Sequence, residues 1–321
     1  MLGLPVWIVA FFLLAFVGAT LTFVVDDAAS AIVAGIVSCA GAFALFRSLD
    51  GQDAAEQFAL ALSLAGQGLM IIGLAQIFDW DPAVMFFAIA AVELGLALLI
   101  PQFLHRFLTA GGCALALALA VTELELHGLA TPLLCVALAS IWLDPGKWAT
   151  GGGFWRPIGY GLVLAIMLIE LFRLFGGAEL LGSSPEKSWM TIYGPLIGRG
   201  LSGAVLIWTA ASIAIREGLA VGDRTFMLAI GAPVLSGLLC LVAPGLAPAL
   251  LILLLGYAAG NRLLAGAGIV SLLGFTAHYY YSLHASLLSK SGILAVTGLV
   301  LLTVCFVLRR RPAEGAEPSH A

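Results

Sequence analysis

The chain has very few charged residues for its length. Asp, Glu, Lys and Arg make up 10% of its 321 residues, whereas about 25% is usual for a soluble domain. Its mean hydropathy is +1.10, and so little polar surface would not keep a folded chain of this size dispersed in water. The scarcity of charge therefore excludes an ordinary soluble domain and favours a protein whose solvent is lipid.

The short motifs of classical enzymes and metal sites are also missing. The sequence has no Walker loop, GxSxG, HExxH, dinucleotide fingerprint or CxxC pair. Its five cysteines lie singly in apolar runs, where a free cysteine behaves as a small hydrophobe. No basic patch points to nucleic acid. We therefore predict no metal, no cofactor and no nucleic-acid partner, and an enzyme is the less favoured interpretation, with an intramembrane enzyme left open.

Long apolar runs are what the chain has in abundance. A helix needs about 20 apolar residues to cross the hydrocarbon core, and runs such as 4–25 and 292–308 are continuous rather than alternating. They predict an all-α fold, a polytopic transmembrane helix bundle of about 12 spans. The expected spans cover residues 4–25, 28–46, 58–78, 83–100, 107–121, 129–143, 157–174, 201–215, 226–242, 246–259, 263–282 and 292–308.

Lysine and arginine predict the orientation of these spans. Cytoplasmic loops carry an excess of the two residues. With the N-terminus in the cytoplasm, ten of the fourteen fall inside and four outside. We therefore expect N-in/C-in topology, a single bundle over 1–308 and a short polar cytoplasmic tail over 309–321. The short span 129–143 and the segment 175–200 are its weak points, because a change in either would reverse every later span.

Several polar or glycine-rich stretches are expected to lie outside the spans. His105 and Arg106 are assigned to a loop, and residues 144–156, with three consecutive glycines, are expected to be irregular. Residues 175–200 are expected to hold a helix at the headgroup level that Gly194-Pro195 ends.

Glu93 is the most unusual residue of the predicted spans. It lies near the middle of 83–100, and a charged side chain at the bilayer centre costs about 2.5–3.5 kcal/mol on insertion scales. It is therefore either protonated or faces polar partners. Gln67 lies at similar depth in the preceding span, so we expect a Glu93–Gln67 hydrogen bond. This candidate intramembrane polar site is either a proton or substrate site or, as we favour, structural hydrogen bonding between helices.

A second candidate site is expected at the outer face. Glu170 and Arg173 are spaced i, i+3, which predicts a salt bridge within one helix; an anion-binding Arg173 is the alternative. His278, Tyr279, Tyr280 and Tyr281 end a span, and Lys290 follows in the next turn. Three consecutive tyrosines cannot all face lipid, so at least one is expected to point into the bundle or toward a partner.

Several short stretches near the C-terminus together resemble the signature of a bacterial multi-pass membrane family. They are Gly260-Asn261-Arg262-Leu263-Leu264, the three tyrosines with Ser282-Leu283, Leu287-Leu288 with Lys290-Ser291, and Gly298. That family is catalogued as domain of unknown function 4401. Residues 59–74 also resemble its early helix pair. The resemblance implies the bacterial inner (plasma) membrane. It also implies two membrane partners, a second multi-pass protein and a smaller protein with a GDYxxLxY motif, but no catalytic residue.

Two functional hypotheses follow. The first is a non-catalytic subunit of an envelope membrane complex, in which Tyr280 and Lys290 contribute to assembly. The second is a small-molecule or ion transporter that uses Glu93 and Gln67 at mid-depth.

Overall fold

The computed structural model describes residues 27–48, 53–174, 189–219, 230–231, 233–237, 241 and 245–282. These residues contain no strand and are almost entirely helical, which confirms the all-α class. By its internal contacts the chain divides into two compact units, Met1–Leu273 and Gly274–Ala321. The arrangement of helices given below concerns the first unit alone. The predicted tail, 309–321, lies outside the described residues, and the single bundle over 1–308 stays a prediction.

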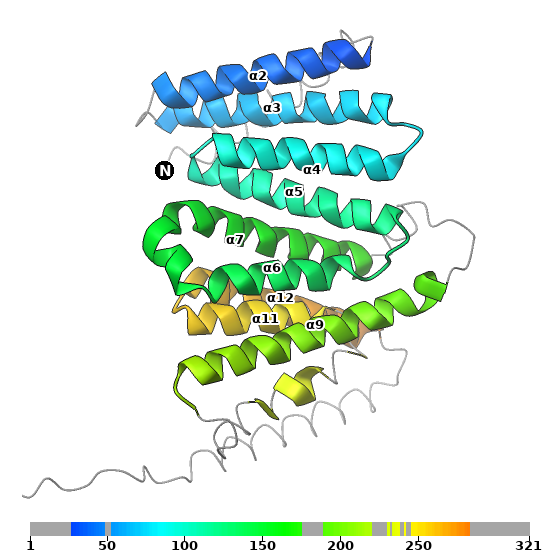
Figure 1. Cartoon of the computed structure of the whole chain (residues 1–321), viewed down its shortest axis with the longest axis vertical. Helices are drawn as coiled ribbons and strands as arrows, with labels where there is room; N and C mark the ends of the chain where they lie inside the picture. Colours follow the sequence, from blue (N-terminus) through cyan, green and yellow to red (C-terminus); the bar gives the residue numbers. More distant parts are fainter. Residues whose placement is uncertain are drawn as a thin grey trace, which may run out of the picture. The chain divides into compact units, whose positions relative to one another are not determined.

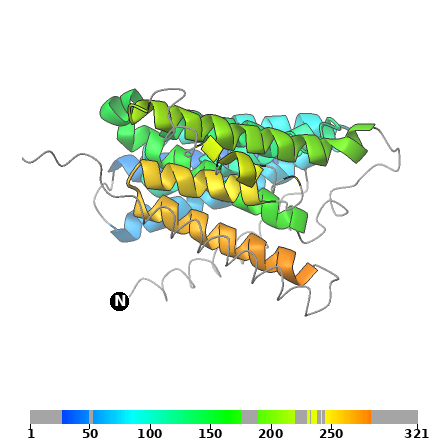
Figure 2. The ribbon, with the colours of Figure 1, turned by 90° about the horizontal axis from the view of Figure 1, so that it is seen from below.

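The helices follow one another along the chain and lie beside their neighbours (Figure 1). Their bounds are α2 Ala28–Ser48, α3 Asp53–Ile77, α4 Pro82–Leu99, α5 Phe103–Glu123, α6 Ala130–Trp142, α7 Pro145–Leu174, α9 Trp189–Arg216, α11 Leu246–Ala258 and α12 Arg262–Ser282. Contacts join α2 to α3, α4 to α5, α5 to α7, α6 to α7 and α9, and α9 to α11. Figure 2 shows the same helices from below.

Six of the described helices are long and apolar enough to cross a membrane. They are Ala28–Ser48, Asp53–Ile77, Pro82–Leu99, Phe103–Glu123, Gly151–Leu174 and Trp189–Arg216. Each overlaps one of the spans expected from the sequence. The expected spans 4–25 and 292–308, and most of 226–242, lie outside the described residues.

Three local expectations were wrong, and all three placed polar or helix-breaking residues outside helices. His105 and Arg106 lie within α5 and are buried. Residues 145–156 belong to α7, with a single non-helical kink at Gly151. Pro195 lies inside α9, which continues through it to Arg216. Apolar runs therefore locate the helices but underestimate their length, because polar side chains with partners extend a helix beyond its apolar part.

Side-chain caps fix several helix starts. The Asp81 carboxylate accepts a hydrogen bond from the backbone N–H of Val84 at 3.2 Å, and Pro82 takes the first helical position. Asp27 likewise accepts from the backbone N–H of Ser30 at 2.6 Å. Hydrogen bonds from Ser30 hold the pKa of the Asp27 carboxyl below its usual value.

Glycines bring the backbones of neighbouring helices into direct contact. A Cβ built on Gly66 of α3 would lie 2.8 Å from the Gly35 carbonyl oxygen of α2. A Cβ built on Gly161 of α7 would lie 2.8 Å from the Gly111 nitrogen of α5. Small residues at helix contacts are typical of membrane helix packing, where dispersion rather than water drives association.

Gly194 and Gly198 of α9 make a similar close contact. A Cβ on either would clash with the backbone carbonyl of His127 or Gly128, in the turn before α6. The start of α9 therefore lies against the start of α6.

The contacts between helices, together with the short connections between consecutive helices, show at which end of the first unit each described helix begins and ends. At one end, α5, α7 and α12 begin and α4, α6 and α11 end; we call it the basic end. Of the eight Lys and Arg residues that the structure describes, six lie toward the basic end and two, Arg173 and Arg199, toward the other. The six are Arg47, Arg106, Lys147, Arg156, Arg216 and Arg262.

Candidate functional site

Glu93 is buried on α4, where it faces α5. Only 5% of its surface is exposed, and its carboxyl group lies against Gly112, whose Cβ would be 3.4 Å from Glu93 Oε2. Among the described residues, none hydrogen-bonds to Oε2 and none forms an ion pair with Glu93. Glu93 Oε2 is therefore a buried polar atom without a hydrogen bond at the interface of α4 and α5. Leaving such an atom unsatisfied destabilises the fold.

Gln67 does not bond Glu93; the predicted Glu93–Gln67 hydrogen bond is replaced by a polar cluster between α3 and α5. The amide nitrogen of Gln67 donates to Ser63 Oγ at 3.2 Å and lies 3.3 Å from His105 Nε2. Ser63 Oγ is 2.7 Å from the same imidazole nitrogen. Ser63 and His105 have no exposed surface. We refer to Ser63, Gln67 and His105 as the α3–α5 polar cluster.

The imidazole of His105 uses one of its two ring nitrogens in the cluster. Nε2 lies within hydrogen-bonding distance of both Ser63 Oγ and the Gln67 amide nitrogen. Nδ1 is fully buried and has no hydrogen-bond partner among the described residues. The ring also contacts Phe46 of α2 edge to face, with centroids 5.9 Å apart. His105 Nδ1 and Glu93 Oε2 are therefore two buried polar atoms without a hydrogen-bond partner among the described residues.

The predicted salt bridge between Glu170 and Arg173 is confirmed. Arg173 Nη1 lies 3.3 Å from Glu170 Oε1 on α7. Thr131 of α6 donates to that same oxygen at 2.6 Å, and Arg173 Nη1 lies 3.3 Å from the threonine hydroxyl. The carboxylate is thus neutralised and hydrogen-bonded, as a buried charge requires, which favours a structural role over an anion-binding Arg173.

The remaining outer-face residues are only partly described. His278, Tyr279, Tyr280 and Tyr281 lie in the last turns of α12, and Lys290 lies outside the described residues. Their role at an outer face stays a prediction. No group of three His, Cys, Asp or Glu side chains that could hold a metal ion occurs among the described residues.

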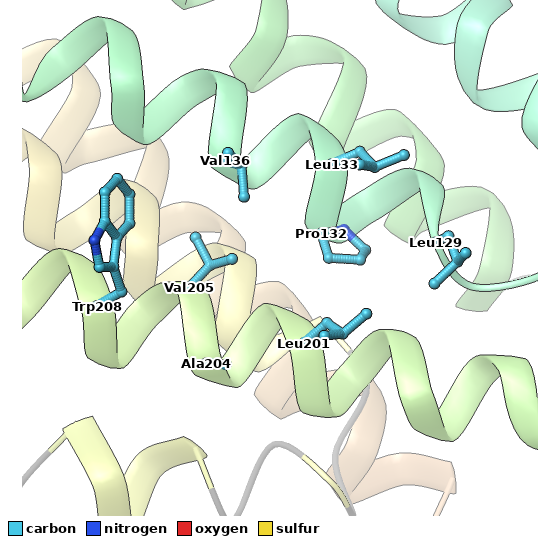
Figure 3. A pocket seen from close by; sticks show the side chains of 8 residues that line it. All are labelled: Leu129, Pro132, Leu133, Val136, Leu201, Ala204, Val205 and Trp208. Atoms are coloured by element: carbon cyan, nitrogen blue, oxygen red, sulfur yellow. The ribbon is translucent and has the colours of Figure 1, made fainter.

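An apolar groove of about 530 Å³ lies between α6 and α9 (Figure 3). Three residues of α6, the residue just before it and four residues of α9 line the groove: Leu129, Pro132, Leu133, Val136, Leu201, Ala204, Val205 and Trp208. Figure 3 shows these side chains facing one another across the two helices. The groove can take an apolar chain or helix but offers no polar group to bind.

Sequence reasoning missed Ser63, His105, Thr131 and the groove. Ser63 and Gln67 are spaced i, i+4, so a polar face on α3 was visible. The partners of these residues come from helices about 40 positions away along the chain, and no local pattern points to them.

The fold and its sites together define an all-helical protein with several membrane-length helices and buried polar contacts between them. The model of a protein family described as "Domain of unknown function (DUF4401)" matches residues 1–311. The chain belongs to this family. No curated protein and no solved structure matches it.

Proposed function

We propose that the chain is a multi-pass protein of the bacterial inner membrane, with about 12 spans and both termini in the cytoplasm. The six membrane-length helices support this placement. The gathering of Arg47, Arg106, Lys147 and three further basic residues at one end supports the orientation, because Lys and Arg concentrate on the cytoplasmic side.

Within that membrane we propose that it is a non-catalytic subunit of an envelope complex. The observation that carries this proposal is the apolar groove between α6 and α9. Membrane helices associate by close packing against small residues, and Ala204 gives the groove such a position. Trp208 adds a large ring of the kind that anchors interfaces. The proposed occupant is a transmembrane helix of a co-encoded partner, either the second multi-pass protein or the GDYxxLxY-motif protein.

Filling the groove tests the proposal. A tagged chain at native expression would be purified in a gentle detergent, and the proteins that stay bound identified by mass spectrometry. Ala204→Phe places a ring in the groove. Ala91→Phe is the matched control, since Ala91 is an exposed alanine on α4, away from the groove.

We expect a stoichiometric membrane partner with the wild-type chain and with Ala91→Phe, and its loss with Ala204→Phe. A wild-type chain that purifies alone, or a partner that survives Ala204→Phe, would contradict the subunit proposal.

A second candidate is a transporter, and it is favoured by Glu93 and His105. Each has a buried polar atom without a partner among the described residues, and intramembrane ionisable groups commonly mark ion pathways. In this scheme Glu93 carries the proton or cation, and Gln67 orients His105 from α3.

Glu93→Gln tests the transport scheme, because it keeps the shape of the side chain and removes its ability to ionise. Proton-coupled uptake into proteoliposomes should be abolished by Glu93→Gln and retained by Glu125→Gln, a change in the exposed turn after α5. Equal uptake by the two variants would remove Glu93 from the scheme.

A further inference from the structure

Arg106 is buried, unlike the other Lys and Arg side chains that the structure describes. Only 6% of its surface is exposed, yet none of the described residues offers it a carboxylate. Arg173, the contrasting case, has Glu170 at 3.3 Å. A guanidinium does not lose its proton in proteins, so a buried arginine needs an anion or strong hydrogen-bond acceptors.

Two contacts within the protein hold the Arg106 side chain in place. Nε donates to the carbonyl oxygen of Ala97 at 2.8 Å, in the last turn of α4. The guanidinium carbon lies 4.8 Å from the centroid of the Phe154 ring, on α7. The Nε edge of the planar guanidinium is therefore hydrogen-bonded, and one of its faces is covered by the phenyl ring. The edge that carries the two terminal nitrogens makes neither contact.

Those terminal nitrogens remain available to a ligand. They form no hydrogen bond with the described residues and are not among the fully buried polar atoms without partners. They therefore reach the surface of a side chain that is otherwise enclosed. Their parallel N–H groups match the two oxygens of a phosphate or carboxylate.

The surroundings of Arg106 also favour an anion. The residue lies in the first turns of α5, where the helix dipole is positive. Trp155, next to Phe154, is covered by the ammonium group of Lys147 at 5.2 Å. Lys147 forms an ion pair with the Asp144 carboxylate at 3.7 Å. Of these two cations, Arg106 is therefore the one whose positive charge is not neutralised by a carboxylate.

We propose that Arg106 and the face of Phe154 form a binding site for a phosphate group at the basic end of the helices. The chemistry fits the phosphate ester of an anionic lipid headgroup, and a free phosphate offers the same oxygens. The lipid source is favoured by position, because basic pockets between membrane helices on the cytoplasmic side bind anionic headgroups. This site is separate from the groove between α6 and α9 and does not depend on it.

The test measures ligand-induced stabilisation of the full-length chain. The midpoint of thermal unfolding would be followed in phosphatidylcholine, in phosphatidylcholine with added phosphatidylglycerol, and in phosphatidylcholine with inorganic phosphate. A ligand that binds only the folded state raises the midpoint. The variants are Arg106→Gln and the matched control Arg156→Gln, an exposed arginine at the same end.

We expect phosphatidylglycerol to raise the midpoint of the wild-type chain and of Arg156→Gln, and Arg106→Gln to lose most of that rise. A rise with inorganic phosphate alone, lost in Arg106→Gln, would assign the site to a free anion. Because each rise is compared with the same variant in neutral lipid, a lower starting stability does not affect the result.

Two outcomes would overturn the proposal: no rise with either ligand, or an equal rise in Arg106→Gln and Arg156→Gln. If Arg106→Gln does not fold, Phe154→Leu takes its place. It keeps the charge but removes the ring that positions it, so the rise should be smaller than in the wild type, and an unchanged rise would count against the site.

Discussion

The imidazole Nε2 of His105 lies 2.7 Å from the hydroxyl oxygen of Ser63. This contact joins α3 to α5 across 42 positions of the chain, and neither residue has exposed surface. Gln67 bonds both of them from one turn further along α3. The arrangement holds a histidine side chain in a fixed orientation inside the helix interface.

Ser63→Ala should destabilise the protein. The change leaves His105 Nε2 and the Gln67 amide with one partner fewer at a buried position, which costs about 1–3 kcal/mol. The free energy of unfolding, followed by denaturant titration in mixed micelles, would measure the loss. Ser140→Ala is the control, because Ser140 is exposed and its hydroxyl bonds only its own helix; it should change stability by less than about 0.5 kcal/mol. Equal effects would show that the cluster does not stabilise the fold.

Thr131 and Glu170 should be energetically coupled. Thr131 donates a short hydrogen bond to a buried carboxylate, and bonds to charged groups contribute about 1.5–3 kcal/mol. Thr131→Val and Glu170→Gln should therefore each destabilise the fold, and the double variant should lose less than the sum. A double-mutant cycle on the free energy of unfolding measures this coupling, and strict additivity would contradict the contact.

Two glycines of α3, two positions apart, should respond to alanine in opposite ways. A Cβ on Gly66 would lie 2.8 Å from Cys39 Sγ and from the Gly35 carbonyl, so Gly66→Ala should overpack α2 and cost about 1–3 kcal/mol. A Cβ on Gly68 would meet nothing within 4 Å. Gly68→Ala should then stabilise the helix by about 0.5–1 kcal/mol. Thermal unfolding of the two variants in one detergent would show whether the signs differ.

Asn261 combines two roles that substitution can separate. Its side-chain oxygen accepts from the backbone N–H groups of Leu263 and Leu264, which caps α12, and its nitrogen donates to the Tyr160 hydroxyl at 2.6 Å. Asn261→Ala removes both, whereas Asn261→Asp keeps the cap. Loss of a cap typically costs about 1 kcal/mol, so Asn261→Ala should melt at a lower temperature than Asn261→Asp. Equal melting temperatures would show that the cap contributes little and would assign the main role to the tyrosine contact.

Local rules predicted much of this architecture from the sequence. The salt bridge of Glu170 with Arg173 follows from i, i+3 spacing on one helix. The span expected over 83–100 follows from its continuous apolar run, and α4 covers Pro82–Leu99. Part of the predicted family signature also has a structural reason: Gly260 has a φ of 61°, which glycine adopts easily, and Asn261 caps the next helix.

What sequence could not predict depends on contacts between distant segments. His105 and Arg106 appeared to be loop residues because their side chains are polar. In the fold, Ser63 lies beside the imidazole, and the Ala97 carbonyl accepts from Arg106. Pro195 appeared to end a helix. Pro is nevertheless tolerated within membrane helices, because neighbouring groups satisfy the freed backbone, and α9 continues through it.

The contact between α2 and α3 also has an entropic consequence. Where Gly35 meets Gly66, each backbone reaches the other helix, and the side chains of Met70 and Cys39 pack against the two glycines. Glycine has no rotamers to lose when it becomes buried, whereas long side chains lose up to about 2 kcal/mol each. The two glycines therefore add no side-chain entropic cost of their own to the association of α2 with α3.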